Sequence, residues 1–266
     1  MMEQVSFDSM LEELNSSKDF SIPVALGRTF DGVIAVIDLK KCPNLLISGN
    51  QETGKTILLD SIICSIMKTR APEDVMLALI DLKGVEFPVY NGIPHLMTPV
   101  ITRPAEAIRF FDDLVLEVER RISLFNEARA RKIEEYNQMI ETRKNPGEKL
   151  QYIVVIVDEF SPLILEYGKR FEALIKRITS VARFCGIHLV LSTNRSSADV
   201  ITGVIKSNLP SQIAFAVSCG INSRIILDQL GAENLLERGE MLCKIAGSRQ
   251  VIKVQGAYIE DIRAYL

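Results

Sequence analysis

Short runs of consecutive apolar residues recur along the chain, and each is followed by small or polar residues and then by a longer segment with helical periodicity. The runs lie at residues 44–48, 75–81, 152–158, 187–193 and 212–217. Apolar residues on consecutive positions, rather than on alternate ones, are typical of strands that are buried on both faces. The pattern therefore predicts an α/β fold with a mainly parallel central sheet flanked by helices.

Three further segments complete the expected organisation. Residues 22–39 alternate apolar and other positions around an Asp31-Gly32 turn signal, which predicts a β-hairpin. Residues 104–144 carry apolar positions at helical spacing and predict one or two long surface helices that end before the breaker Asn145-Pro146-Gly147. The amino-terminal residues read as a short helix or a loose arm. We therefore divide the chain into an N-terminal arm or helix at residues 1–22 and one compact domain at 23–266.

The composition is typical of a soluble globular protein and excludes several classes. Of 266 residues, 47% are hydrophobic and 24% are charged, which leaves no room for a mostly disordered or fibrous chain. The formal charge of -3 gives no global positive field, so a polyanionic partner needs a local basic patch. No apolar run approaches the roughly 18 residues that a membrane span needs, and we expect no secretory signal at the amino end.

Cysteine usage indicates a reducing compartment, and histidine usage gives no sign of a zinc site. The 5 cysteines are widely spaced and form no CxxC pair, so we expect reduced, mostly buried thiols in a cytosolic protein. His95 and His188 are too few and too distant in sequence to suggest a zinc cluster.

The strongest local motif is a GxxxxGKT sequence that follows the first apolar run and opens a helical segment at residues 57–68. Its glycines let the loop wrap tightly, its backbone N–H groups can point at phosphates, and the helix N-terminus adds a partial positive charge. Lys55 is expected to reach the β- and γ-phosphates, and the Thr56 hydroxyl to bind Mg²⁺. Glu52 is unusual because a triphosphate repels a carboxylate, so we expect it to point outward. The predicted nucleotide-binding residues are Gly49, Asn50, Gln51, Glu52, Thr53, Gly54, Lys55, Thr56 and Ile57.

Polar residues at the ends of two other apolar runs extend this site. Asp158 is placed to hold Mg²⁺ and Glu159 to orient or polarise an attacking water, although both could instead be a solvated pair that caps a strand. Asn194 could sense the γ-phosphate or its water, or could belong to a locally satisfied turn. The spacing of about 100 residues between the two main motifs favours a RecA-like ATPase over a small GTPase. No NKxD-like guanine reader is visible, so ATP is the expected nucleotide.

Together these motifs resemble the motor domain of the FtsK/SpoIIIE family of double-stranded DNA translocases. The resemblance spans residues 23–259 and is carried by several stretches unrelated to nucleotide binding in general. The stretches are PNLLISGNQETGKT, VYNGIPHLMTPVIT, YIVVIVDEF, GIHLVLSTNRSSADVITGVIKSNLPSQIAFAVS, SRIILDQLGAENLLERGEMLC and VQGAYI.

The resemblance implies a RecA-like P-loop ATPase that assembles as a homo-oligomer, a hexameric ring, and threads duplex DNA through its channel at the expense of ATP. A neighbouring subunit would then supply an arginine to the γ-phosphate, with Arg224 the first candidate and Arg195 the second; either could instead be a surface ion-pair residue. Chromosome segregation or DNA transfer would be the setting. The expected location is the cytoplasm, without membrane contact by this chain itself, or at a membrane through segments outside this chain.

A local surplus of positive charge fits a DNA channel. Between residues 168 and 206 there are seven basic residues and two acidic ones, in an otherwise acidic chain. The resemblance points to Lys169, Arg170, Arg195 and Lys206 as contacts to the phosphate backbone, which would make DNA binding steeply salt-dependent. A solvated basic helix face is the competing interpretation.

Two departures from the family pattern keep other functions open. The loop reads NQET where DNA pumps usually carry a Gly/Ser-rich sequence, and this variant is similar to the ATPases of type VII secretion. The third motif reads STNRSS where ATQRPS is usual, so Asn194 is one methylene shorter than the usual glutamine. The alternatives to a DNA motor are therefore a related motor for protein export and a nucleotide-binding scaffold with impaired hydrolysis.

Overall fold

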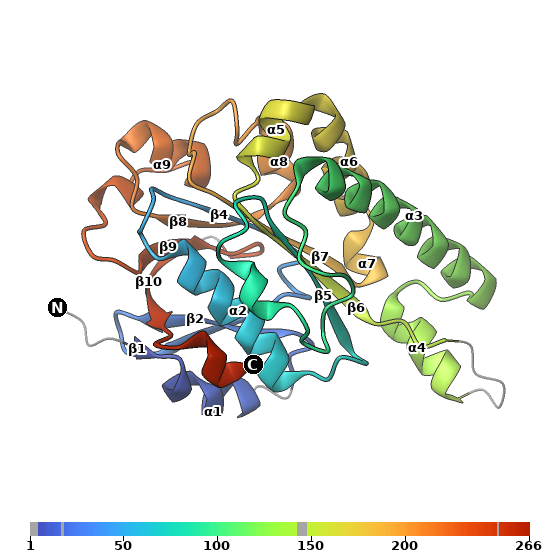
Figure 1. The fold of residues 1–266 in the computed structure, drawn as a ribbon. Coiled ribbons are helices and arrows are strands. Elements are labelled where there is room, and N and C mark those ends of the chain that lie inside the picture. Colours follow the sequence, from blue (N-terminus) through green and yellow to red (C-terminus); the bar gives the residue numbers. More distant parts are fainter. Residues whose placement is uncertain (1–4, 17–18, 143–147, 249) are drawn as a thin grey trace.

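One mixed sheet forms the centre of the molecule (Figure 1). The computed structural model describes residues 5–16, 19–142, 148–248 and 250–266. In these ranges the strands are β1 (Val5–Ser6), β2 (Pro23–Thr29), β3 (Ile34–Asp38), β4 (Asn44–Ser48), β5 (Val75–Asp81), β6 (Tyr152–Asp158), β7 (Ile187–Thr193), β8 (Ser211–Phe215), β9 (Glu240–Lys244) and β10 (Val251–Tyr258). Their order across the sheet is β3-β2-β10-β9-β8-β4-β7-β6-β5, and β1 pairs with β10 beside this path.

The sheet has a parallel half and an antiparallel half. Strands β8, β4, β7, β6 and β5 run parallel to one another, whereas the ladders from β8 through β9, β10 and β2 to β3 are antiparallel. The α/β class is as predicted, and the sheet is mixed rather than purely parallel. Four predicted runs coincide with β4, β5, β6 and β7, and the fifth lies close to β8.

Helices cover both faces of the sheet. They are α1 (Asp8–Ser16), α2 (Lys55–Thr69), α3 (Pro104–Ala128), α4 (Ile133–Thr142), α5 (Ser161–Tyr167), α6 (Lys169–Thr179), α7 (Ala182–Cys185), α8 (Gly203–Asn208) and α9 (Gly220–Leu227), with short 3-10 turns η1 (Phe87–Tyr90), η2 (Ala232–Asn234) and η3 (Ile262–Tyr265). None of these helices is long and apolar enough to cross a membrane.

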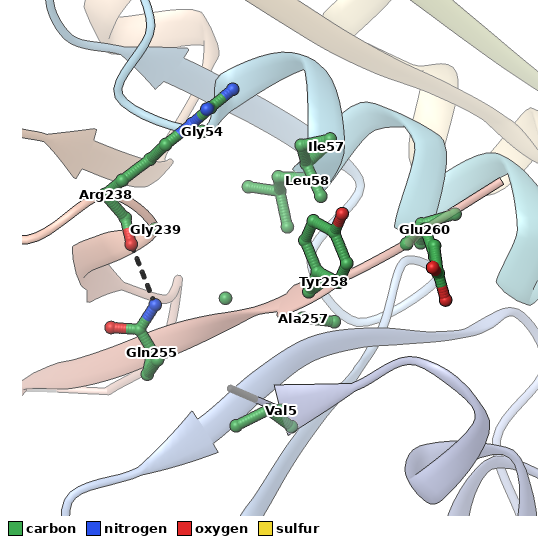
Figure 2. A pocket seen from close by; sticks show the side chains of 12 residues that line it. Val5, Gly54, Ile57, Leu58, Arg238, Gly239, Gln255, Ala257, Tyr258 and Glu260 are labelled. Carbon is green, nitrogen blue, oxygen red and sulfur yellow. Dashed lines mark hydrogen bonds between the residues drawn. The ribbon is translucent and has the colours of Figure 1, made fainter. Parts of the chain in front are cut away.

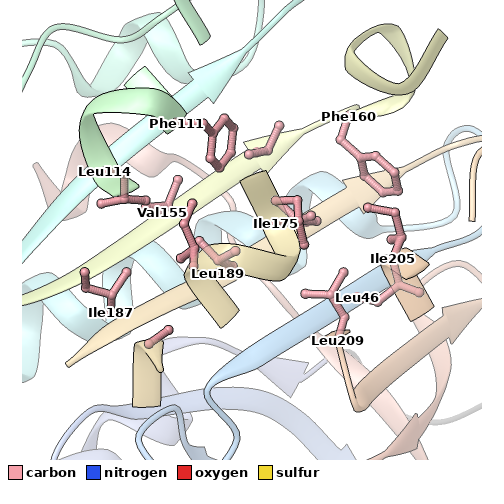
Figure 3. Packing of buried hydrophobic residues seen from close by; sticks show 14 of the residues in the cluster. Leu46, Phe111, Leu114, Val155, Phe160, Ile175, Ile187, Leu189, Ile205 and Leu209 are labelled. Atoms are coloured by element: carbon pink, nitrogen blue, oxygen red, sulfur yellow. The ribbon is translucent and has the colours of Figure 1, made fainter. Parts of the chain in front are cut away.

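Alternate residues of the central strands face two separate cores, which explains their unbroken apolar sequence. Leu45 and Ile47 of β4 pack in the cluster that contains α2. Leu46 points the other way, into the cluster built with Phe111 of α3 and Ile175 of α6 (Figure 3). Burial on both faces fixes β4 firmly, and β4 leads directly into the predicted phosphate loop.

The segments outside the parallel half agree in part with the prediction from the sequence. The predicted hairpin is confirmed, because β2 and β3 pair antiparallel. The long helical region consists of α3 and α4, and the chain turns after α3 at Arg129, which has a φ of 56°; the predicted breaker lies outside the described residues. Near the amino end, Phe7 and Met10 pack in a small cluster with Cys64 of α2. The boundary at residues 22/23 stays a prediction.

Candidate nucleotide-binding site

The predicted phosphate loop lies between the carboxyl end of β4 and the amino end of α2. Gly54 precedes the helix with a φ of 115°, in a region that residues with a side chain rarely adopt. No described side chain caps this helix end, and the first N–H groups of any helix lack an intrahelical partner. The loop therefore presents donors and the positive end of the helix dipole to whatever occupies the space in front of it.

Segments distant in the sequence hold this loop in place. A Cβ on Gly49 would lie 2.6 Å from the Cβ of Phe215, so only glycine allows the loop to approach β8 this closely. The Asn50 N–H donates to the carbonyl oxygen of Ala216 at 2.8 Å. The Gly239 N–H donates to the carbonyl oxygen of Thr53, also at 2.8 Å. The strands that follow the motif by more than 150 residues thus fix its shape.

The lysine of the motif is buried at the base of the loop. The Lys55 ammonium donates to the carbonyl oxygen of Asn50 and lies 3.5 Å from the Thr53 hydroxyl. Burial lowers the pKa of Lys55 to about 8, and the nearby carboxylates of Asp158 and Glu159 partly oppose this shift. A phosphate in the loop would supply a close anionic partner, which favours the charged lysine.

Two aspartates end neighbouring parallel strands beside the loop. Asp81 of β5 is in register with Asp158 of β6. Burial raises the pKa of Asp158 to about 6, while Lys83 partly opposes the shift at an Nζ–Oδ2 distance of 4.0 Å. The buried Oδ2 of Asp158 accepts no hydrogen bond within the described part of the chain. An unsatisfied buried carboxylate oxygen of this kind suits a cation ligand.

Asp81 carries no recognisable motif, yet it organises the loop that follows β5. Its two carboxylate oxygens accept the backbone N–H groups of Lys83, Gly84, Val85, Glu86 and Phe87 at 2.8 to 3.1 Å. This loop brings Lys83 and Glu86 to the wall of the phosphate cavity.

The carboxylate of Glu159, the residue after Asp158, accepts hydrogen bonds at both of its oxygens. Its backbone has a φ of 61°, and its oxygens accept hydrogen bonds from Thr193, Ser161 and Asn194. Burial raises its pKa, but these hydrogen bonds outweigh burial, and the net effect is a lowered pKa. Glu159 is therefore held as an ionised carboxylate.

These elements enclose a cavity of about 330 Å³ in front of the loop. Its lining includes Lys55, Thr56, Asp158 and Asn194, and Glu159 does not belong to it. Glu52 is exposed and borders the cavity with a φ of 59°. The remaining lining residues are Gln51, Gly54, Ile57, Asp60, Lys83, Glu86 and Arg238.

Thr56 and Asp158 offer the hard oxygen atoms that Mg²⁺ prefers. The described residues contain no group of three His, Cys, Asp or Glu that could hold a metal alone. A Mg²⁺ site that takes one or two protein ligands and completes its shell with phosphates and water fits this arrangement.

A second cavity of about 400 Å³ adjoins the first and shares Gly54, Ile57 and Arg238 with it (Figure 2). The ring of Tyr258 points from β10 toward Ile57 and Leu58 of α2. The Gln255 side-chain amide donates to the carbonyl oxygen of Arg238 at 3.0 Å. Of the residues that line this second cavity, the sequence predicted only Gly54 and Ile57 as nucleotide-binding residues. The stretches ERGEMLC and VQGAYI contributed to the resemblance, but no local chemistry marks them as cavity walls.

The predicted finger arginines and DNA contacts line neither cavity. Arg224 is exposed on α9, and Arg195 is exposed and pairs with Asp199 at 3.5 Å. Lys169 is exposed at the start of α6.

Two of the four predicted DNA contacts are engaged in ion pairs with acidic residues distant in sequence. Arg170 pairs with Asp112 at 2.7 Å, and both side chains are largely exposed. Lys206 pairs with Asp228 at 2.7 Å and also donates to the carbonyl oxygen of Arg224. Its side chain is only 19% exposed.

Comparison with known proteins identifies close sequence relatives. The model of the FtsK/SpoIIIE family matches residues 8–198. DNA translocase FtsK of Oceanobacillus iheyensis is 45% identical over 261 residues, which are 97% of this chain and 33% of the relative. DNA translocase SpoIIIE of Bacillus subtilis is 45% identical over 262 residues, with the same coverage. The chain thus spans about a third of the length of these curated relatives.

Solved structures share the fold. The pCW3 conjugation coupling protein TcpA, in its monomer form with ATPγS, has a TM-score of 0.83 and 28% identity and covers 99% of this chain and 72% of its own. The cytoplasmic domain of the type VII secretion ATPase EccC from Thermomonospora curvata has a TM-score of 0.82, covering 97% of this chain and 32% of its own, but is only 21% identical. The second likeness shows the fold alone. The predicted RecA-like P-loop ATPase fold is confirmed.

Proposed function

Because the chain belongs to the FtsK/SpoIIIE family, we propose that it is an ATP-driven motor for double-stranded DNA, in chromosome segregation or DNA transfer. The observation that carries this proposal is the convergence of Lys55, Thr56 and Asp158 on one cavity in front of the phosphate loop. A cavity with this donor set suits a triphosphate and its Mg²⁺.

Together the two adjoining cavities would accommodate a whole nucleotide. A triphosphate tail in the first cavity starts at Gly54 and Ile57, which also line the second, so the base and ribose would enter the second. There the ring of Tyr258 and the side chains of Ile57 and Leu58 offer apolar surfaces for a flat base. We take ATP as the nucleotide.

Four residues of the first cavity, together with Glu159, would have defined parts in hydrolysis. Lys55 neutralises charge on the β- and γ-phosphates, and Thr56 and Asp158 would hold Mg²⁺. When bound, the ion stabilises the charge that develops on the phosphate oxygens. Asn194 lines the cavity and would orient the γ-phosphate or the attacking water. Glu159 orients that water and withdraws its proton once its carboxylate faces the cavity.

Assembly would complete the site. Arg224 lies outside its own cavity and is exposed on α9, so it can serve as an arginine finger only for a neighbouring subunit. We propose a hexameric ring in which Arg224 is the first candidate for this role and Arg195 the second.

Exposed basic side chains would contact the DNA backbone. Lys169 and Arg170 lie at the start of α6, and Arg195 lies in the loop between β7 and α8. The exposed Arg170–Asp112 pair can be exchanged for a phosphate at small cost, because surface ion pairs contribute little. We assign Lys206 a smaller part, because its ammonium is already bound to Asp228.

The state of the thiols supports the proposed compartment. All five cysteines are free and four of them are buried. Free thiols suit a reducing environment, so we propose that the motor acts in the cytoplasm.

The test is an ATPase assay with Mg²⁺, with and without duplex DNA, over a range of salt concentrations. A DNA motor should show turnover that duplex DNA stimulates and that high salt suppresses. Lys55→Ala and Glu159→Gln should abolish turnover, and Glu159→Gln should still bind nucleotide. Equal rates in all three proteins would leave only a binding scaffold, and turnover that ignores DNA would favour a motor for protein.

A further inference from the structure

The side chain proposed to activate water does not line the cavity in which it must act. Glu159 Oε1 accepts the hydroxyl of Thr193 at 2.7 Å and the backbone N–H of Ser161 at 3.2 Å. Glu159 Oε2 accepts the backbone N–H of Asn194 at 2.8 Å. Both carboxylate oxygens are thus occupied, and Glu159 is not among the residues that line the cavity.

Two of these three donors belong to the end of one strand. Thr193 is the last residue of β7 and is fully buried. Its hydroxyl oxygen also accepts the backbone N–H of Arg195 at 3.0 Å. One hydroxyl therefore connects the carboxylate of Glu159 to the backbone of Arg195, an exposed residue in the loop between β7 and α8.

The backbone of Glu159 needs this support. A residue with a side chain and a φ of 61° occupies a sparsely populated conformation, and such conformations persist only where the surroundings hold them. The hydrogen bonds from Thr193 and Asn194 provide that hold. A shift of the Arg195 backbone would disturb the Thr193 hydroxyl first, and through it the carboxylate.

We propose that Thr193 is a positioning residue that keeps Glu159 retracted until Arg195, in the loop between β7 and α8, engages the DNA backbone. This inference rests on the proposed function and deepens it by adding the regulation of the same site. Engagement of Arg195 by a phosphate moves its backbone N–H away from the Thr193 hydroxyl, which frees the carboxylate to turn toward the water. Hydrolysis without DNA is then slow because the retracted state of Glu159 is favoured.

The matched variants are Thr193→Val, which keeps the shape and removes the hydroxyl, and Thr193→Ser, which keeps the hydroxyl. Thr193→Val should raise kcat without DNA about fivefold, equivalent to about 1 kcal/mol in the barrier. The DNA-stimulated kcat and KM should stay unchanged, so the stimulation ratio falls. Thr193→Ser should behave as the original protein. An unchanged rate without DNA, or an equal loss of kcat with and without DNA, would show a static support and overturn the proposal.

A second measurement needs no variant. In the original protein, backbone amide exchange at Asn194 should accelerate when duplex DNA and a non-hydrolysable ATP analogue are added together, since its N–H leaves Glu159. Unchanged protection of the Asn194 amide despite DNA binding would refute the proposed release of Glu159. Failure of the proposed function is distinguishable, because the unmodified protein would then lack nucleotide binding or DNA-stimulated turnover altogether.

Discussion

Replacing Gly49 by alanine should damage both the stability of the fold and the geometry of the phosphate loop. The new Cβ would lie 2.6 Å from the Cβ of Phe215 and 3.1 Å from two of its backbone atoms, whereas ordinary contacts start at 3.4 Å. Phe215 is buried, and β8 is paired with β4 on one side and with β9 on the other. The strand has little room to yield, so the loop must move.

The size of both effects follows from this geometry. Overpacking of a well-filled interior costs about 1–3 kcal/mol, so we expect the free energy of unfolding to fall by about 2 kcal/mol. For a domain of this size that lowers Tm by about 4–8 °C. A displacement of the loop approaching 1 Å can reduce turnover by about 100-fold. Urea or thermal unfolding measures the first effect, and steady-state ATP hydrolysis measures the second.

The matched control is Gly203→Ala at the start of α8. A Cβ there meets no atom within 4 Å, and the backbone is not left-handed. This variant should unfold within about 0.5 kcal/mol of the original protein and should turn over ATP normally without DNA. If Gly49→Ala proved as stable and as active as Gly203→Ala, the close approach of the loop to β8 would not matter and the reasoning would fail.

Three further predictions concern charge and the second cavity. Burial raises the pKa of Asp158 to about 6, against an ordinary value of 3.8. Between these two pH values the folded state binds more protons than the unfolded state, so the free energy of unfolding falls as pH rises from 3.8 to 6. Asp158→Asn should therefore raise the free energy of unfolding near neutral pH by up to about 3 kcal/mol while abolishing turnover; a variant that is no more stable in urea titrations would contradict the assigned burial. Lys169→Ala should reduce the slope of log DNA affinity against log salt concentration by about one, the effect of a single lysine that binds a phosphate. Lys206→Ala should leave the slope unchanged, because its ammonium already pairs with Asp228. Equal slopes for both variants would contradict these different roles of Lys169 and Lys206. Tyr258→Ala should raise the nucleotide dissociation constant about tenfold by loss of stacking while Tyr258→Phe retains affinity, and calorimetry that finds no difference between the two would remove the base from the second cavity.

The parallel half of the sheet and the phosphate loop could be predicted from local sequence. Strands buried on both faces leave unbroken apolar runs, which is why β4 to β7 were predicted at their observed bounds. The phosphate loop was equally visible, because its chemistry needs Gly54, Lys55 and Thr56 in sequence.

What depends on tertiary contacts was not visible. The second cavity is built by Arg238, Gln255 and Tyr258, which lie on or next to the antiparallel strands β9 and β10, far from the motif in sequence. The loop-ordering part of Asp81 depends on a chain reversal that no motif marks. Lys206 counted as a basic residue in the sequence, and only the fold brings Asp228 to it.

The five backbone N–H groups that donate to the Asp81 carboxylate order the loop after β5 before any ligand binds. A loop tied down this way has already lost its conformational freedom during folding. Lys83 therefore has a fixed backbone position at the cavity wall, and under the proposed function no ordering of this loop would have to precede the chemistry. The conformational entropy of ordering this wall is lost once, during folding, and would not be lost again in each catalytic cycle of the proposed ATPase.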